Sequence, residues 1–255
     1  MKKEKLRVCF RALGVDGLLE TCPLEGQVVV CRRVVFGDIE GACMGEALTE
    51  MSCRSFSSEL AAKTPTPGGG ATSALVGALA SSLCSMAAQF TVGKEGYGDV
   101  EADMRRLISE VADLRLHLLD LVEEDAAAYA SLSVVLRMPK DEPKRVSELE
   151  EALKTSAAVP IDTMHSVCRV IELLEEVGEK GSRLLSSDVG CGASFASAAL
   201  QAASLTVFVN TKMSMSMDCQ WAKQLESSCA LMIDEYVPRA QLVVEKMADR
   251  VRRRG

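Results

Sequence analysis

Apolar residues recur every three or four positions from residue 55 onward, which is the spacing of one face of an α-helix. The clearest stripe contains Met104, Leu107, Ile108, Val111, Leu114, Leu118, Leu121 and Val122. A second stripe contains Leu149, Leu153, Ala157, Ile161, Met164, Cys168, Ile171 and Leu174. Both stripes predict long helices with one buried face, the first of them ending near residue 136.

Two further stretches, residues 71–93 and 189–211, carry no charge and are rich in Ala, Ser and Gly. Membrane spans favour Leu, Ile, Val and Phe, whereas Ser, Gly, Gln and Asn dilute these two stretches, so we expect buried helices rather than membrane spans. Helices are also expected at residues 56–62 and 218–251. The predicted fold class is all-α, a bundle of long helices.

Several residues are placed to start these helices. Asp99 precedes the first stripe, and Ser147 with Glu150 forms a capping box before the second. Ser187 and Asp188 stand before the second charge-free stretch and are expected to cap it.

Prolines and glycines interrupt the helical pattern. Pro160 and Pro238 lie inside predicted helices and are expected to kink or split them. Gly178 and Gly181 are expected to end the helix that carries the second stripe.

Residues 1–50 differ from the rest of the chain. Residues 27–36 form the one strongly β-branched run and predict a short β segment. This region is either a small appendage on the main domain or lies upstream of a native start at Met44 or Met51. We therefore divide the chain into an N-terminal extension, residues 1–50, and a helical domain, residues 51–255.

Composition narrows the functional classes. The net charge is −7 and 4% of the residues are aromatic, which disfavours nucleic-acid binding because that needs a basic surface and often stacking rings. The ten cysteines are irregularly spaced and there are two histidines, so we expect neither a disulfide framework nor a zinc site. No apolar core follows the basic residues 2–5, so no secretory signal is expected, and the predicted location is the reducing cytoplasm.

A glycine loop precedes the first charge-free stretch: Pro65 and Pro67 are followed by Gly68, Gly69 and Gly70. A Pro turn and three glycines at a helix start leave backbone N–H groups unpaired, and such groups suit an anionic or strongly polar ligand. The alternative is that these residues only separate two helices.

One acid lies on an apolar face. Continued at helical spacing, the first stripe reaches Asp125, Tyr129 and Leu132. This face is therefore expected to meet the core or a partner, whereas Glu123 and Glu124 lie nearer solvent. Burial of Asp125 would raise its pKa, which suits a general acid or base near neutral pH. The alternative is a structural acid paired with a lysine or with backbone groups.

Three more polar residues are candidates. Asn210 stands among apolar residues and is expected to hydrogen-bond protein or ligand. Lys94 and Lys140 are expected in loops beside helix ends, where a cation can meet a substrate carboxylate.

Taken in order, several segments resemble the cyclodeaminase/cyclohydrolase family of tetrahydrofolate enzymes. They are residues 64–70, 91–94 with Tyr97, 121–129, 137–140, 159–160, 187–188 and 207–210. The resemblance covers roughly residues 52–250, and the order of the segments makes it more specific than any one motif.

The resemblance implies an all-helical homodimer with a folate site near the subunit interface. It implies hydrolysis of 5,10-methenyltetrahydrofolate, or formation of that compound from 5-formiminotetrahydrofolate with release of ammonia. The family's catalytic acid falls on Asp125. The implied substrate-binding residues are Gly68, Gly69, Gly70, Lys94, Tyr97, Lys140, Asp188 and Asn210. The tetrahydrofolate derivative is the substrate, and no metal or redox cofactor is implied.

The chain departs from the family pattern at Glu95, where a second basic residue is usual, and at Thr206, where an Asn is common. Residues 182–185 replace an Asn-Pro turn. These differences leave the exact folate open, although the lack of a formiminotransferase segment favours the cyclohydrolase. The alternative functions are a catalytically inactive relative that binds folate or a protein partner, and a dimeric bundle whose acid is structural.

Overall fold

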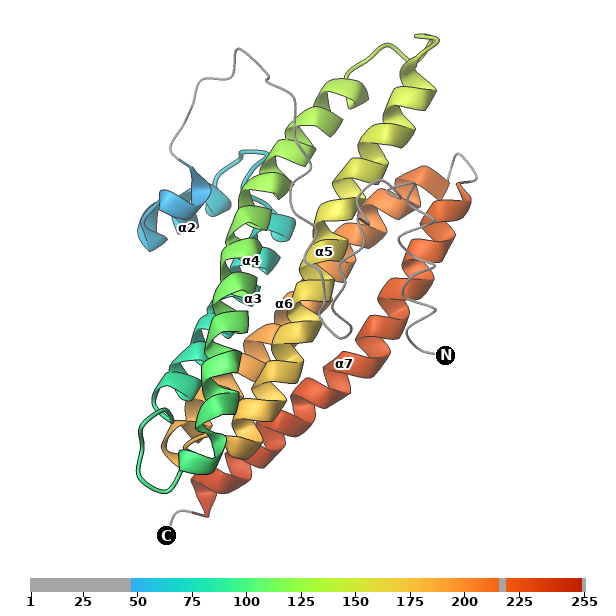
Figure 1. Cartoon of the computed structure of the whole chain (residues 1–255). Helices are drawn as coiled ribbons and strands as arrows, with labels where there is room; N and C mark the ends of the chain where they lie inside the picture. The colour runs from blue at the N-terminus through green and yellow to red at the C-terminus, as the bar shows by residue number, and fades with distance from the viewer. Residues whose placement is uncertain (1–46, 216–218, 254–255) are drawn as a thin grey trace.

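The computed structural model describes residues 47–215 and 219–253, and within these ranges every regular element is a helix (Figure 1). Two short helices, η2 (Leu48–Glu50) and α2 (Cys53–Ala61), come first. The long helices are α3 (Gly69–Gln89), α4 (Glu101–Leu136), α5 (Arg145–Lys180), α6 (Ser186–Met215) and α7 (Gln220–Arg252). The all-α prediction is confirmed, and the predicted β segment at residues 27–36 lies outside the described residues.

Helices α3 to α6 form an up-and-down four-helix bundle. α3 and α5 each pack against both α4 and α6, and α7 lies along α6 and α5. In Figure 1, α4, α5 and α7 form the near layer, with α3 and α6 behind them. Consecutive helices run in opposite directions, so the start of α3 lies beside the C-terminal half of α4.

The core forms where the predicted stripes meet. On α4 the fully buried members include Met104, Leu107, Leu118 and Val122, as the spacing predicted. Small residues on α3 and α6 allow close approach of the helices: a Cβ at Gly192 of α6 would lie 3.5 Å from the Ala80 carbonyl oxygen of α3. The composition of these two helices therefore reflects packing between backbones.

Two stretches, Gly69–Gln89 and Arg183–Ser214, are long and apolar enough to cross a membrane. In the bundle, 56% of the most apolar window of the first stretch is buried, and 44% of the second. Core helices of soluble proteins have the same composition, so these two stretches are weak evidence for a membrane.

The predicted starts of α4 and α5 are wrong. Asp99 lies in the 3₁₀ helix η3 (Gly98–Val100), which continues directly into α4, so Asp99 does not cap that helix. α5 already begins at Arg145, so Ser147 lies inside its first turn. There the Ser147 hydroxyl donates to the Lys144 carbonyl, and the capping box with Glu150 does not form.

The predicted start of α6 is also wrong. Ser182 accepts a hydrogen bond from the Leu184 N–H and caps the 3₁₀ helix η4 (Arg183–Leu185), which runs directly into α6. Ser187 and Asp188 therefore lie in the first turn of α6 and do not precede it.

Neither internal proline splits its helix. α5 continues through Pro160 and α7 continues through Pro238. Pro160 is buried in the bundle, whereas Pro238 is exposed. Gly178 lies inside α5, and Gly181 is the C-cap residue of that helix, so of these two glycines Gly181 alone ends it.

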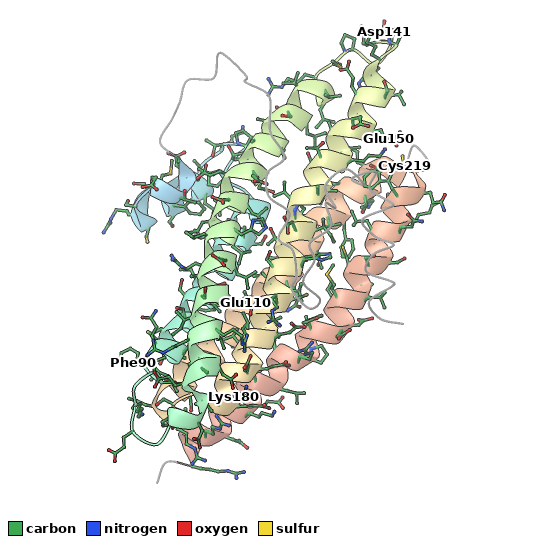
Figure 2. All side chains as sticks on the ribbon, in the orientation of Figure 1. Phe90, Glu110, Asp141, Glu150, Lys180 and Cys219 are labelled. Atoms are coloured by element: carbon green, nitrogen blue, oxygen red, sulfur yellow. The ribbon has the colours of Figure 1, made fainter. Side chains whose placement is uncertain are left out.

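Ion pairs link α4 and α5 within the near layer. Arg169 Nε of α5 lies 2.5 Å from Glu110 Oε1 of α4, and Lys180 Nζ lies 2.6 Å from Asp103 Oδ2 (Figure 2). These partly exposed pairs align α4 with α5 over their lower halves, while each pair adds little to the free energy of unfolding.

Candidate active site

Asp125 lies where α4 packs against the start of α3. Its Oδ2 accepts a hydrogen bond from the Ala71 backbone N–H at 2.8 Å. Gly68 is the N-cap of α3, so Ala71 is the third helical residue and its N–H has no partner within the helix. The carboxylate thus caps α3 from a neighbouring helix, and the positive end of the helix dipole favours its charged form.

Gly70 leaves room for this carboxylate. A Cβ at Gly70 would lie 2.0 Å from Asp125 Oδ1 and 2.6 Å from Asp125 Cγ. A Cβ at Gly69 would meet nothing within 4 Å. The sequence predicted that N–H groups at this helix start face a ligand. In the structure one of them, the Ala71 N–H, donates to Asp125.

Burial raises the pKa of Asp125 above its ordinary value of 3.8, and the hydrogen bond from Ala71 works in the opposite direction. Leu132 is buried in the core, whereas Tyr129, on the face predicted to meet the core or a partner, is 42% exposed in the single chain. The reason is that α3 begins beside Asp125 and leaves the next turn of α4 uncovered on that side.

The two acids that precede Asp125 lie in different surroundings. Glu123 Oε1 accepts from the backbone N–H and the hydroxyl of Thr49, at 2.8 and 2.9 Å. Burial raises the pKa of Glu124, which lies near His117 and Asp162 on the α5 side of the helix. Thr49 escaped prediction because it precedes the helical pattern in the sequence.

Lys94 and Tyr97 lie at the opposite end of the bundle. Lys94 Nζ donates to Ser182 Oγ at 2.5 Å and lies 5.4 Å from the centroid of the Tyr97 ring. Asp188 lies at the same end, in the first turn of α6. The 21 residues of α3 separate this group from Asp125. At the helical rise per residue, that separation is about 30 Å.

Lys140 lies in the turn between α4 and α5, at the tip marked by Asp141 in Figure 2. Phe90 marks the opposite end of the bundle in the same view. Of the predicted site residues, the structure therefore brings Asp125 together with Gly68, Gly69 and Gly70, and it places Lys94, Tyr97 and Asp188 in a second group.

Asn210 is buried between helices on the Asp125 side of the bundle. Its Nδ2 donates to the carbonyls of Ser156 and Thr206, each at 3.2 Å. The hydroxyl of Ser156 donates in turn to the Ala128 carbonyl of α4 at 3.3 Å. The expected hydrogen bonds of Asn210 are present, and their acceptors are protein carbonyls.

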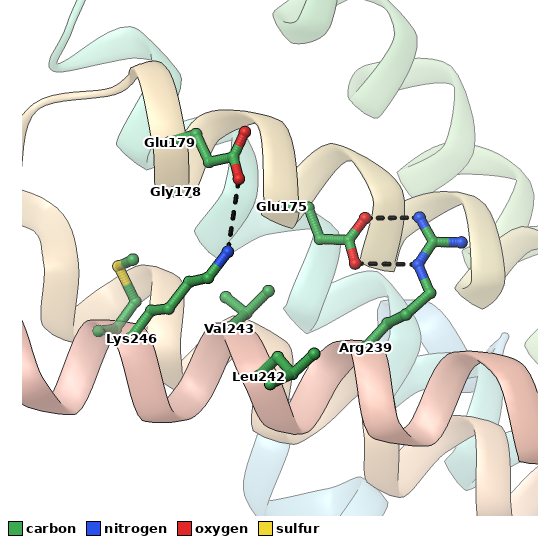
Figure 3. A pocket seen from close by; sticks show the side chains of 8 residues that line it. Glu175, Gly178, Glu179, Arg239, Leu242, Val243 and Lys246 are labelled. Carbon is green, nitrogen blue, oxygen red and sulfur yellow. Dashed lines mark hydrogen bonds and ion pairs between the residues drawn. The ribbon is translucent and has the colours of Figure 1, made fainter.

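A pocket of about 250 Å³ lies between α5 and α7, on the lower half of the bundle (Figure 3). Its charged groups are paired with one another: Arg239 binds Glu175 at 2.5 Å, and Lys246 lies 3.5 Å from Glu179. These pairs leave no excess charge to attract an ionic ligand. Within residues 47–215 and 219–253, no group of three or more His, Cys, Asp or Glu side chains is arranged to hold a metal ion.

The sequence profile of the family described as formiminotransferase-cyclodeaminase matches residues 52–231. This range contains the glycine loop, Asp125 and Asn210, and it covers well over half of the chain. The chain belongs to the formiminotransferase-cyclodeaminase family. The family resemblance expected from the sequence is confirmed.

Individual relatives agree with this assignment. A methenyltetrahydrofolate cyclohydrolase of Methylorubrum extorquens is 40% identical over 162 residues, which are 62% of this chain and 77% of that protein. The formimidoyltransferase-cyclodeaminase of Rattus norvegicus is 28% identical over 215 residues, which are 83% of this chain but 38% of the rat protein. This family member therefore spans well under half of the rat relative.

A solved structure shares the fold. The crystal structure of formiminotetrahydrofolate cyclodeaminase from Thermotoga maritima superposes with a TM-score of 0.67 at 28% identity. The match covers 80% of this chain and 96% of that one. The helical bundle described above is therefore the fold of a family enzyme over almost its whole length.

The Gly70 contact predicts the outcome of adding one methyl group. Gly70→Ala should lower the free energy of unfolding by about 2 kcal/mol, because the new Cβ overlaps the Asp125 carboxylate. Gly69→Ala, one residue away in open space, should be neutral or slightly stabilising, since Ala favours helix. Urea unfolding measures both variants, and equal stability of the two would contradict the contact.

The raised pKa of Asp125 predicts a pH-dependent change in stability. Below about pH 4 both the folded and unfolded chains hold the proton, whereas above the raised folded pKa the folded state must keep a partly buried charge. Asp125→Asn should therefore raise Tm at pH 7.5, with a gain that shrinks toward pH 4. Asp113→Asn, at an exposed position of α4, is the control. A loss of Tm at pH 7.5, or a gain that persists at pH 4, would contradict the assignment.

Proposed function

We propose that this protein hydrolyses 5,10-methenyltetrahydrofolate to 10-formyltetrahydrofolate, with Asp125 as the acid-base group. The observation that carries the proposal is a carboxylate of raised pKa, held against the start of α3 within a family scaffold. The 40% identity to a methenyltetrahydrofolate cyclohydrolase supports this reaction. A second candidate, formation of the methenyl compound from 5-formiminotetrahydrofolate with ammonia release, is supported by the cyclodeaminase structure.

Asp125 has the properties that hydrolysis requires. In the proposed reaction, the carboxylate takes a proton from water as the water oxygen bonds to the carbon between N5 and N10. The bond from that carbon to N5 then breaks, Asp125 returns its proton to N5, and the hydroxyl group becomes the formyl carbonyl as its proton leaves to solvent. The cationic substrate thereby yields a neutral product and one proton. The Ala71 N–H holds the carboxylate in one orientation throughout.

We propose that the protein acts as a homodimer joined through α3 and α6. Both helices lie in the rear layer of Figure 1. Large apolar side chains are exposed to solvent there: Leu79 on α3, Phe90 at the C-cap of α3, and Phe195, Leu205 and Val209 on α6. Large apolar side chains exposed on two helices that pack against each other favour an interface between subunits at this face.

A two-fold axis across the middle of α3 would bring the separated site residues together. In an isologous dimer of this kind, the Gly70 end of one α3 lies beside the Phe90 end of the partner helix. Lys94 and Tyr97 of the partner subunit would then approach Asp125, although within one chain they lie about 30 Å away. Lys94 and Lys140 would meet the glutamate carboxylates of the folate.

We propose further that residues 51–255 carry the activity, with residues 1–50 as an extension, and that the enzyme works in the cytoplasm without a metal or redox cofactor. Among the described residues, Cys53, Cys84, Cys168 and Cys191 are free thiols, which supports a reducing location. Neither a nucleic acid nor a membrane is proposed as a partner.

The absorbance of methenyltetrahydrofolate provides the direct assay. The purified protein should accelerate loss of this absorbance beyond the buffer rate, whereas its appearance from 5-formiminotetrahydrofolate with ammonia release would identify a cyclodeaminase. Asp125→Asn should lower kcat by about a hundredfold or more with folding intact and no loss of Tm, and the exposed Asp113→Asn should leave kcat unchanged. A folded protein without either activity would favour the alternative of a catalytically inactive relative that binds folate or a protein partner.

Mixed dimers test whether the site is shared between subunits. Asp125→Asn and Lys94→Gln should each be inactive alone, whereas co-expression of the two variants should restore about a quarter of the wild-type activity. The reason is that half of the dimers are mixed, and each mixed dimer has one intact site. Confirmed mixed dimers without activity would place Lys94 and Asp125 in sites of the same chain, and full activity of Lys94→Gln alone would remove Lys94 from the site.

A further inference from the structure

α5 lacks one backbone hydrogen bond inside the bundle. The carbonyl of a helical residue accepts from the N–H four positions later, and the residue four positions after Ser156 is Pro160, which has no N–H. Ser156 and Pro160 are both buried, so bulk water does not supply a donor. A buried carbonyl without a donor is strongly unfavourable, so this one needs a partner from elsewhere in the protein.

Asn210 supplies that donor from α6. Its Nδ2 lies 3.2 Å from the Ser156 carbonyl oxygen and 3.2 Å from the Thr206 carbonyl oxygen. These two acceptors use both hydrogens of the amide and determine which way it points, because the flipped amide would set its own oxygen against two carbonyls. The Asn210 side chain therefore replaces the N–H that Pro160 removes.

The same turn of α5 also contacts the helix that carries the acid. Ser156 Oγ donates to the Ala128 carbonyl at 3.3 Å, and Ala128 is buried one turn after Asp125 on α4. We infer that Asn210 is a positioning residue: through the carbonyl freed by Pro160, it holds the turn of α5 that fixes the Asp125 turn of α4. The test of this role by kcat rests on the function proposed above, whereas the test by Tm does not.

The second internal proline provides a comparison within the same protein. Pro238 frees the carbonyl of Asp234 in α7, and both of these residues are exposed. Water can satisfy that carbonyl, so it requires no side-chain donor. Pro160 and Pro238 thus make the same change to a helix in two different environments.

Asn210→Leu removes the donor while keeping a side chain of similar size. Tm should fall by about 3–8 °C, because a buried carbonyl loses its partner. kcat should fall about tenfold with KM little changed, because the acid is displaced while the folate contacts remain. The lower limb of the kcat–pH profile, which reports the ionisation of Asp125 in the proposed mechanism, should shift as well.

A double variant that restores the backbone N–H is the decisive test of this inference. Pro160→Ala supplies an N–H for the Ser156 carbonyl, so the double variant Asn210→Leu with Pro160→Ala should recover most of both the Tm and the kcat. Pro238→Ala is the matched control, because it adds an N–H to α7. Its gain in Tm should be the same in the wild type and in the Asn210→Leu background, without recovery of kcat, whereas the gain from Pro160→Ala should be larger in the Asn210→Leu background.

Two results would overturn the inference. If Asn210→Leu raises KM and Pro160→Ala gives no recovery, Asn210 binds the substrate directly. If the double variant regains Tm but not kcat, Asn210 stabilises the bundle without positioning Asp125. The Tm values of the wild type, the single variants and the double variant are measured on the intact chain without substrate. If the proposed folate reaction is wrong, the wild type will be inactive while the Tm values still show the recovery.

Discussion

The contact between the Asp125 carboxylate and the start of α3 is the constraint on which the site depends. One hydrogen bond, from the Ala71 N–H, joins an unpaired helical donor to a partly buried acid, and each group satisfies the other. The contact requires glycine at position 70, since the carboxylate occupies the space of a Cβ. It also sets where α3 begins along α4, and hence where the bundle leaves Tyr129 exposed.

A second polar contact lies in the same part of an otherwise apolar core. Asn210, Ser156 and the Ala128 carbonyl link α6, α5 and α4 one turn away from the acid. Apolar packing alone tolerates small shifts of one helix along another, whereas hydrogen bonds of fixed length do not. The upper half of the bundle is therefore held by polar contacts near Asp125, and the lower half is aligned by ion pairs between α4 and α5.

The family sequence pattern spreads over both ends of the bundle. Asp125 and the glycine loop lie at one end of α3, and Lys94 and Tyr97 lie beyond the other end. A single chain cannot close this distance without breaking α3, whose glycines and alanines are packed in the core. A second subunit is the arrangement that would complete one site from both groups while leaving the helix intact, and the apolar surface on α3 and α6 is where it would bind.

The helices, the buried face of α4 and the family could all be predicted from the residues alone, because helical spacing and ordered motifs are local properties of the chain. The sequence also singled out Asp125, since an acid on an apolar stripe is visible without a structure. The exact helix starts were missed at Asp99 and Ser187, because 3₁₀ helices run directly into α4 and α6. The start at Ser147 was missed because α5 already begins at Arg145. Only the tertiary structure showed that Gly70 accommodates Asp125 and that Asn210 serves the carbonyl freed by Pro160, because both contacts join residues about fifty positions apart and depend on how the helices align.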